Sequence, residues 1–169
     1  MKTITINLYS FSELLPEAKQ KALNKYFDIN VDCDWWHGTY DDAANIGLKI
    51  TGFDLDRGNY INGDFTHSAE KTAKQILLDH GNGCKTYILS SFYLHEVKSI
   101  EDAHNKDEDD DKRSEDLQNA ENEFRNNLLN EYHKMLKNEY EYLTSEQAII
   151  ETFEANDYTF EINGRMNNG

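Results

Sequence analysis

Three aspartates near the middle of the chain have the residue type and spacing of a divalent-metal site. Asp54 and Asp56 are two residues apart on a predicted strand, so both carboxylates project from one of its faces. Asp64 lies on the predicted return strand and could approach them, as in metal-dependent phosphoryl-transfer enzymes. Alternation with Phe53 and Phe65 is also what a one-sided sheet requires, and no glycine-rich phosphate loop accompanies the aspartates. The sequence therefore favours a structural role, and a metal-dependent phosphoesterase or nucleotide-binding protein is kept as the alternative.

Two cysteine–histidine pairs make up the ligand set of a Cys2His2 zinc site. They are Cys33 with His37, and His80 with Cys84. The Cys-x3-His spacing is unusual for a zinc knuckle, and both cysteines also suit the role of small buried hydrophobic residues. We therefore expect neither a metal nor a cofactor.

Four basic residues near the same hairpin are the candidates for a cationic pocket. They are Lys49, Arg57, Lys71 and Lys74. A pocket of this kind would let the protein sequester a signalling nucleotide, which is a further functional alternative.

The distribution of negative charge is the most informative feature of the sequence. The net charge is −15, and residues 101–125 hold eleven acidic residues against four basic ones. Such a field repels nucleic acid and attracts basic proteins, and carboxylates along a helix approximate the charge ladder of DNA. A solvated loop that only maintains solubility is the alternative. The residues predicted to contact a partner here are Asp107, Glu108, Asp109, Asp110, Asp111, Glu115 and Asp116.

An aromatic group precedes these residues in the chain. Trp35, Trp36 and Tyr40 could stack on nucleic-acid bases, but base stacking needs nearby cations and the neighbours here are aspartates such as Asp34 and Asp41. We expect one tryptophan in the core and the other, Trp36, at a partner surface.

The elements that would position these residues can be read from hydrophobic periodicity. Alternation predicts strands over 2–9 and 157–162 and a hairpin over 48–66, with a bulge at Gly52. Helical spacing predicts the other elements, with Ser12, Ser68 and Thr144 or Ser145 as N-caps and Gly47 as a C-cap. The predicted helices cover 12–28, 32–46, 68–80, 87–97, about 113–140 and 145–154.

These elements predict a single α+β domain over 1–169, with both terminal strands and the hairpin in one small antiparallel sheet. Aspartate is a poor interior helix former, so we expect a loop or frayed helix end at about 101–116. An apolar stripe on the predicted helix at about 113–140 could pair with the same helix of a second copy of the chain, or be covered by other helices of the monomer. Its residues are Leu117, Phe124, Leu128, Tyr132, Met135 and Tyr140.

Two segments carry a resemblance to known proteins. They are residues 11–58, with FDLDRGNYINGDF at 53–65 as the most specific piece, and YEYLTSEQAIIETFEANDYTFEINGRM at 140–166. Together they cover most of the chain. Both resemble a group of small proteins encoded by bacteriophages and prophages. The resemblance implies a phage or mobile-element setting and no particular chemistry.

Together, these features predict a non-enzymatic inhibitor or binding protein of phage type that acts against a host defence. The expected partner is a basic, nucleic-acid-binding host protein, with no direct contact to nucleic acid or membrane. The chain has no run of about 18 apolar residues, and its first residues lack the apolar region of a signal peptide. We therefore expect it in the host cytoplasm.

Overall fold

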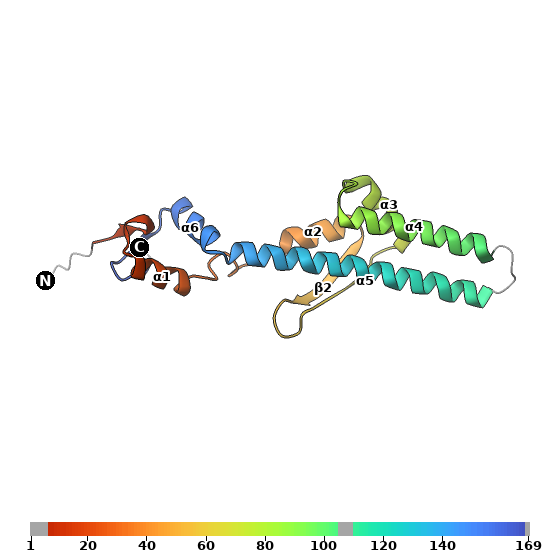
Figure 1. Cartoon of the computed structure of the whole chain (residues 1–169), viewed down its shortest axis with the longest axis horizontal. Helices are drawn as coiled ribbons and strands as arrows, with labels where there is room; N and C mark the ends of the chain where they lie inside the picture. The colour runs from red at the N-terminus through yellow and green to blue at the C-terminus, as the bar shows by residue number, and fades with distance from the viewer. Residues whose placement is uncertain (1–6, 105–109, 168–169) are drawn as a thin grey trace. The chain divides into compact units, whose positions relative to one another are not determined.

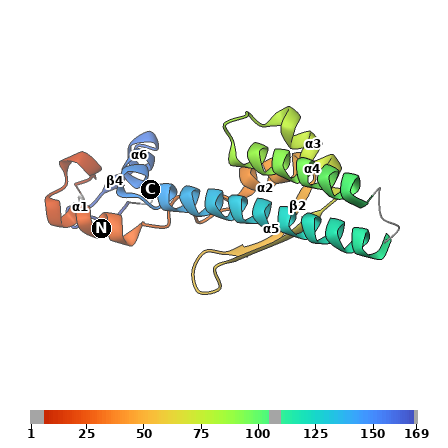
Figure 2. The same cartoon turned by 45° about the vertical axis from the view of Figure 1, so that its right-hand side comes forward.

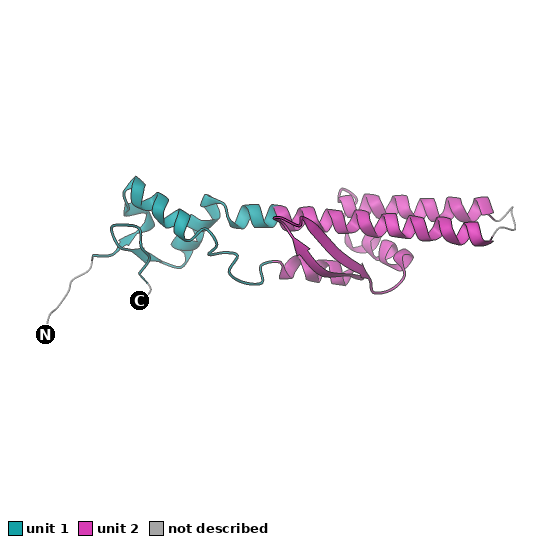
Figure 3. Ribbon diagram, turned by 90° about the horizontal axis from the view of Figure 1, so that it is seen from below, with its two compact units in different colours: residues 1–35, 138–169 teal, residues 36–137 magenta. Residues whose placement is uncertain are grey.

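The computed structural model describes residues 7–104 and 110–167 of the chain. Its helices and small antiparallel sheets confirm the predicted α+β class. The chain divides into two compact units (Figure 3): unit 1 comprises residues 1–35 and 138–169, and unit 2 comprises residues 36–137. The single domain over 1–169 stays a prediction.

Unit 1 contains the paired terminal strands and two short helices. Strand β1 (Tyr9–Ser10) pairs antiparallel with β4 (Thr159–Phe160), so Tyr9 lies opposite Phe160. These strands are much shorter than the predicted segments, of which residues 1–6 lie outside the described part. Between them in sequence come a 3-10 turn, η1 (Phe11–Glu13), then α1 (Pro16–Lys25) and α6 (Glu146–Ala155).

The helix ends of unit 1 follow from local chemistry. Pro16 occupies the first helical position of α1, where its missing N–H is not needed. Ser145 caps α6 by accepting a hydrogen bond from the Ala148 N–H, as its sequence position predicts. The predicted N-cap at Ser12 is wrong. The N-cap residue of α1 is Leu15, and Ser10 forms a capping box with Glu13 at the start of η1. The hydrogen bond from the Ser10 backbone N–H lowers the pKa of the Glu13 carboxyl.

Unit 2 contains the second helix, the hairpin and two long helices. The elements of unit 2 in chain order are α2 (His37–Asn45), β2 (Leu48–Asp54), β3 (Tyr60–Phe65), α3 (Ala69–Asp79), α4 (Lys85–His104) and the part of α5 (Asp110–Leu143) up to residue 137. Helix α2 begins later than the predicted range of 32–46. Figures 1 and 2 show α4 and α5 running side by side, with the β2–β3 hairpin against α5.

The hairpin confirms the predicted turn and bulge but not the predicted single sheet. The strands β2 and β3 pair antiparallel from Leu48 opposite Phe65 to Asp54 opposite Tyr60, with an irregularity between Ile50 and Gly52. This pair forms its own two-stranded sheet, and the terminal strands pair with each other in unit 1. The expected single sheet is therefore wrong, because strand pairing depends on long-range contacts that periodicity does not contain.

The core of unit 2 lies between the hairpin, α3, α4 and α5. Phe124 on α5 stacks on Tyr93 of α4, with ring centroids 4.4 Å apart, and on Phe65 of β3 at 5.7 Å. Leu128 and Tyr132 are also fully buried in this core. The middle of the stripe that the sequence offered for dimer pairing is therefore covered within the chain.

Both helices that flank the acidic segment are longer than expected. Helix α4 continues to His104, and α5 begins at Asp110. Residues 101–104 and 110–116 are therefore helix ends and not a loop, whereas the alternative of a frayed helix end stays a prediction; residues 105–109 lie outside the described residues. The reason is that Asp110 and Asp111 occupy the first turn of α5, where the helix dipole favours negative charge.

None of the helices in the described residues is long and apolar enough to cross a membrane.

Candidate functional site

The neighbouring ends of α4 and α5 form an acidic surface in unit 2. Glu101 and Asp102 are exposed in the last turn of α4, and Asp110, Asp111 and Glu115 are exposed in the first two turns of α5. Because the two helices run side by side (Figure 1), these carboxylates belong to one end of the helix pair. We call these five residues the acidic end. Three further predicted contact residues, Asp107, Glu108 and Asp109, lie outside the described residues.

A hydrogen bond between side chains links the two helices beside the acidic end. His104 Nε2 lies 3.0 Å from Asp116 Oδ2, and the side chains are 13% and 38% exposed. Asp116 was predicted to contact a partner, but its carboxylate is engaged within unit 2. The sequence carried no signal for this pair, because the two residues are on different helices.

Two carboxylates of the acidic end are spaced along α5 at a multiple of the phosphate spacing in DNA. Asp111 and Glu115 are one helical turn apart, or about 6 Å along the axis. Phosphates of one DNA strand repeat every 3.4 Å or so along the duplex axis. The rise between Asp111 and Glu115 is therefore close to two phosphate steps. Lys112 and Arg113 in the same turns partly offset its negative charge.

An apolar hollow lies on the same α4 helix, and sequence reasoning missed it. It has a volume of about 440 Å³ and is lined by Tyr87, Ile88 and Phe92, with His95 beside them. Phe92 is 70% exposed, although the next residue, Tyr93, is buried in the core. The signal in the sequence is that Ile88 and Phe92 are four residues apart, which places them on one helix face.

Trp36 occupies a different part of unit 2. Its side chain is half-buried, and its ring lies edge-on to Phe53 of β2, with centroids 5.8 Å apart. Trp35, in unit 1, similarly contacts Tyr140 at 5.7 Å. Both tryptophans therefore pack within their own units, and a partner contact of Trp36 stays a prediction.

The three aspartates proposed as a metal site are not brought together. Asp54 lies opposite Tyr60, and Asp64 is four residues further along β3, or about 13 Å away. The Asp54 carboxylate accepts hydrogen bonds from the backbone N–H groups of Asp56 and Gly58, both at 2.8 Å. The hydrogen bond from the Asp56 N–H has the larger effect and that from the Gly58 N–H the next; together they hold the pKa of the Asp54 carboxyl below its usual range.

Asp64 is engaged elsewhere, with Arg125 Nη1 at 3.3 Å from its Oδ1. Asp54 therefore closes the hairpin turn and Asp64 links β3 to α5. The structure gives these carboxylates the structural role that the alternation of residues favoured.

The cysteine–histidine pairs do not form a zinc site either. In the described residues, no three His, Cys, Asp or Glu side chains gather in a group that could hold a metal ion. Both cysteines are free and exposed, so they are not the buried hydrophobic residues that the sequence suggested. His37 lies 3.4 Å from Asp41, and the His80 ring makes a 2.7 Å hydrogen bond with Thr86.

The four basic residues near the hairpin are divided between two elements: Lys71 and Lys74 lie one turn apart on α3, and Lys49 and Arg57 lie on the hairpin. Lys74 pairs with Glu70 at 2.9 Å on α3. Lys49 lies opposite Asp64 at one end of the hairpin, whereas Arg57 is in the turn at the other end. This arrangement does not support the cationic pocket that a nucleotide sponge requires.

Comparisons with known proteins add no family to this description. The chain was compared with models of protein families, with curated proteins and with solved structures, and none of them matches. Function is therefore inferred from the sequence and from the geometry of the side chains.

Proposed function

We propose that this protein is a non-enzymatic binding protein whose acidic end occupies the basic cleft of a nucleic-acid-binding protein. The observation that carries the proposal is the group of exposed carboxylates at the neighbouring ends of α4 and α5. Two packed helices hold these charges in place, so binding loses less conformational freedom than it would with a flexible acidic loop.

The surface around the acidic end supports a protein partner. Phe92 in the apolar hollow and Asp102 lie ten residues apart on α4, or about 15 Å. A partner that contacts both would combine apolar burial with charge pairing, which is the usual composition of a specific interface. Nucleic acid itself would be repelled by the net charge of −15.

The biological setting that we propose is inhibition of a host defence by a phage or prophage protein. It rests on the resemblance of residues 53–65 and 140–166 to phage-encoded proteins. Many defence proteins grip nucleic acid with basic clefts, and a preformed acidic helix pair is suited to compete for such a cleft.

Competition binding tests this proposal directly. Nucleic-acid-binding proteins captured from host lysate would be purified, and the affinity for each measured at two salt concentrations with and without duplex DNA. We expect binding to weaken as salt rises, because the contact is electrostatic, and DNA to displace the protein. An affinity that changes neither with salt concentration nor on addition of duplex DNA would contradict the proposal.

A matched pair of variants tests the role of the acidic end itself. Asp110→Asn with Asp111→Asn removes two exposed charges from the first turn of α5. The control, Glu17→Gln with Glu146→Gln, removes two charges from the first turns of α1 and α6. We expect the first variant to weaken binding by about tenfold or more and the control to bind as the parent does. Equal effects of the two variants would overturn the assignment to the acidic end.

A further inference from the structure

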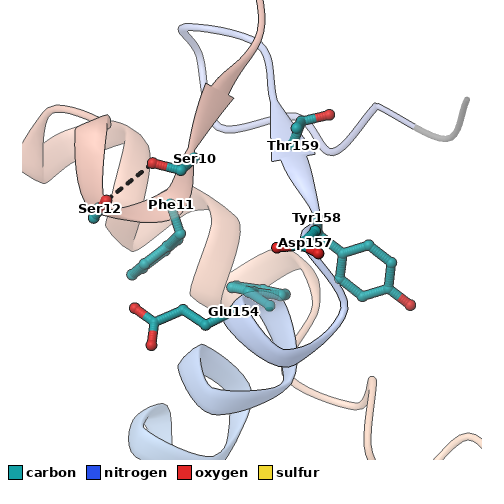
Figure 4. Close-up of a pocket in the computed structure, with 8 residues that line it drawn as sticks. Ser10, Phe11, Ser12, Glu154, Asp157, Tyr158 and Thr159 are labelled. Atoms are coloured by element: carbon teal, nitrogen blue, oxygen red, sulfur yellow. Dashed lines mark hydrogen bonds between the residues drawn. The ribbon is translucent and has the colours of Figure 1, made fainter.

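Unit 1 contains a hollow whose lining combines aromatic rings with carboxylates. It lies between the β1–η1 segment and the end of α6, with a volume of about 350 Å³ (Figure 4). It is lined by Phe11 and Ser12 of the β1–η1 segment and by Glu154, Asp157 and Tyr158 at the end of α6. Figure 4 shows the Tyr158 ring pointing away from Phe11. Two segments from opposite ends of the chain therefore build one concave site.

The aromatic part of the hollow is held rigidly by the core of unit 1. The ring centroids of Phe11 and Phe153 are 5.3 Å apart, and those of Phe153 and Tyr158 are 6.4 Å apart. Phe11 and Phe153 are 6% and 1% exposed, so their rings are fixed by packing on Phe160 and its neighbours. Tyr158, which is half-buried, is the aromatic residue of this group that leaves ring surface open to a cation.

The carboxylates lie where the fold disfavours negative charge. Glu154 is in the last turn of α6 and Asp157 follows it, but a helix C-terminus favours cations, and the last turn of α6 contains no basic residue. Both residues are exposed to the hollow and to solvent. A bound cation would therefore offset the repulsion between these carboxylates and the negative C-terminal end of the α6 dipole.

The backbone fixes the position of Asp157. Its φ is +51°, and its N–H donates to the Glu154 carbonyl oxygen at 3.2 Å, while the Tyr158 N–H donates to that of Phe153 at 3.0 Å. These bonds close the helix end and hold Asp157 beside the aromatic rings. The two carboxylates are thus presented from a preformed turn.

The same aromatic group already attracts a cation from within the unit. Lys19 Nζ on α1 lies 5.7 Å from the centroid of the Phe11 ring, although Lys19 does not line the hollow. Unit 1 as a whole has twelve acidic residues and five basic ones. A positively charged ligand therefore meets a favourable field on approach.

We propose that this hollow binds an organic cation, a guanidinium or ammonium group, which pairs with Glu154 and Asp157 and contacts the half-buried Tyr158. An inorganic cation fits less well, because Ca²⁺ takes six to eight oxygen ligands and rings supply none. The site belongs to unit 1 and does not depend on the acidic end, so the two proposals can fail separately.

The test is an NMR titration of the full chain with two probes, agmatine and an acetylated, amidated tripeptide with a central arginine. We expect saturable changes in the amide signals of Asp157, Tyr158 and Thr159, with a Kd on the order of 1 mM for a ligand of this size. Binding of agmatine alone indicates a free small cation, and binding of the peptide indicates an arginine side chain of a protein. Binding of neither probe beyond the effect of NaCl at equal ionic strength overturns the proposal.

Paired variants locate the binding. Glu154→Gln with Asp157→Asn removes both carboxylates, and asparagine tolerates the positive φ at 157, so the turn is retained. The control, Glu146→Gln with Glu151→Gln, removes the same charge from the same helix outside the hollow. We expect the first variant to weaken binding at least tenfold and the control to change it less than twofold. Equal weakening in both variants would show a general charge effect and refute the site.

Discussion

The Tyr132 hydroxyl on α5 donates a hydrogen bond to Asp42 Oδ2 on α2, across 2.7 Å. Tyr132 is fully buried, and this bond joins two elements of unit 2 that are 90 residues apart in sequence. Tyr132→Phe keeps the packing and removes the donor, so we expect the free energy of unfolding to fall by about 1–2 kcal/mol. Urea unfolding measures the change, with Tyr142→Phe at a 54% exposed position as the control. An unchanged midpoint in Tyr132→Phe would show that the bond contributes nothing to stability.

Alkaline pH should destabilise unit 2 through its buried tyrosines. Burial raises the pKa of Tyr93 to about 12, and burial together with the bond to Asp42 raises that of Tyr132 further. Above pH 10 the unfolded chain loses these protons while the folded chain keeps them, so stability is lost as pH rises from about 10 to 12.

Unfolding measured by circular dichroism between pH 8 and 12 checks this prediction. We expect Tyr93→Phe, which retains the ring against Phe124, to flatten the decline. A slope identical to that of the parent would mean that Tyr93 does not contribute to it.

Gly47 lies just after the end of α2, at a position whose backbone conformation favours glycine. Its φ is +84°, and a Cβ there would fall on the ring of His67. We therefore expect Gly47→Ala to lower the free energy of unfolding by about 1–3 kcal/mol, since both the conformation and the space are unsuitable. Gly38→Ala is the control, because a Cβ at this position of α2 meets open space and alanine favours a helix. Thermal melts should move in opposite directions for the two variants, and parallel shifts would contradict the assignment.

The β2–β3 turn should make unit 2 sensitive to acid. The backbone bonds to Asp54 lower the pKa of its carboxyl in the folded state, so the stability that they contribute is present above the unfolded pKa near 4 and lost as pH falls below it. We expect Asp54→Asn to reduce the decline in stability between pH 5 and pH 2.

Asp56→Asn is the matched control for this measurement. Asp56 is exposed in the same turn, and its carboxylate lies 4.0 Å from Arg57 Nε. Its replacement should leave the acid profile of unfolding unchanged. Equal profiles for the two variants would refute the special role of the Asp54 carboxylate.

Local sequence determined where some of the elements begin or end. Ser68 and Ser145 cap α3 and α6, and Gly47 follows the end of α2 with the positive φ that glycine adopts freely. These features are predictable because capping bonds and backbone preferences act within four or five residues. The hairpin was predictable for the same reason.

Tertiary structure decided which distant residues meet. Asp54 and Asp64 were spaced like metal ligands, but the antiparallel register places them near opposite ends of the hairpin. Asp116 lay in an acidic run, yet its contact is His104 on another helix.

The hollow between Phe11 and Glu154 forms because the two ends of the chain pair through β1 and β4. Charge and periodicity along the sequence determined the types of element and the acidity of their surface. Register and packing, which depend on contacts across the whole chain, determined which of its side chains share a site.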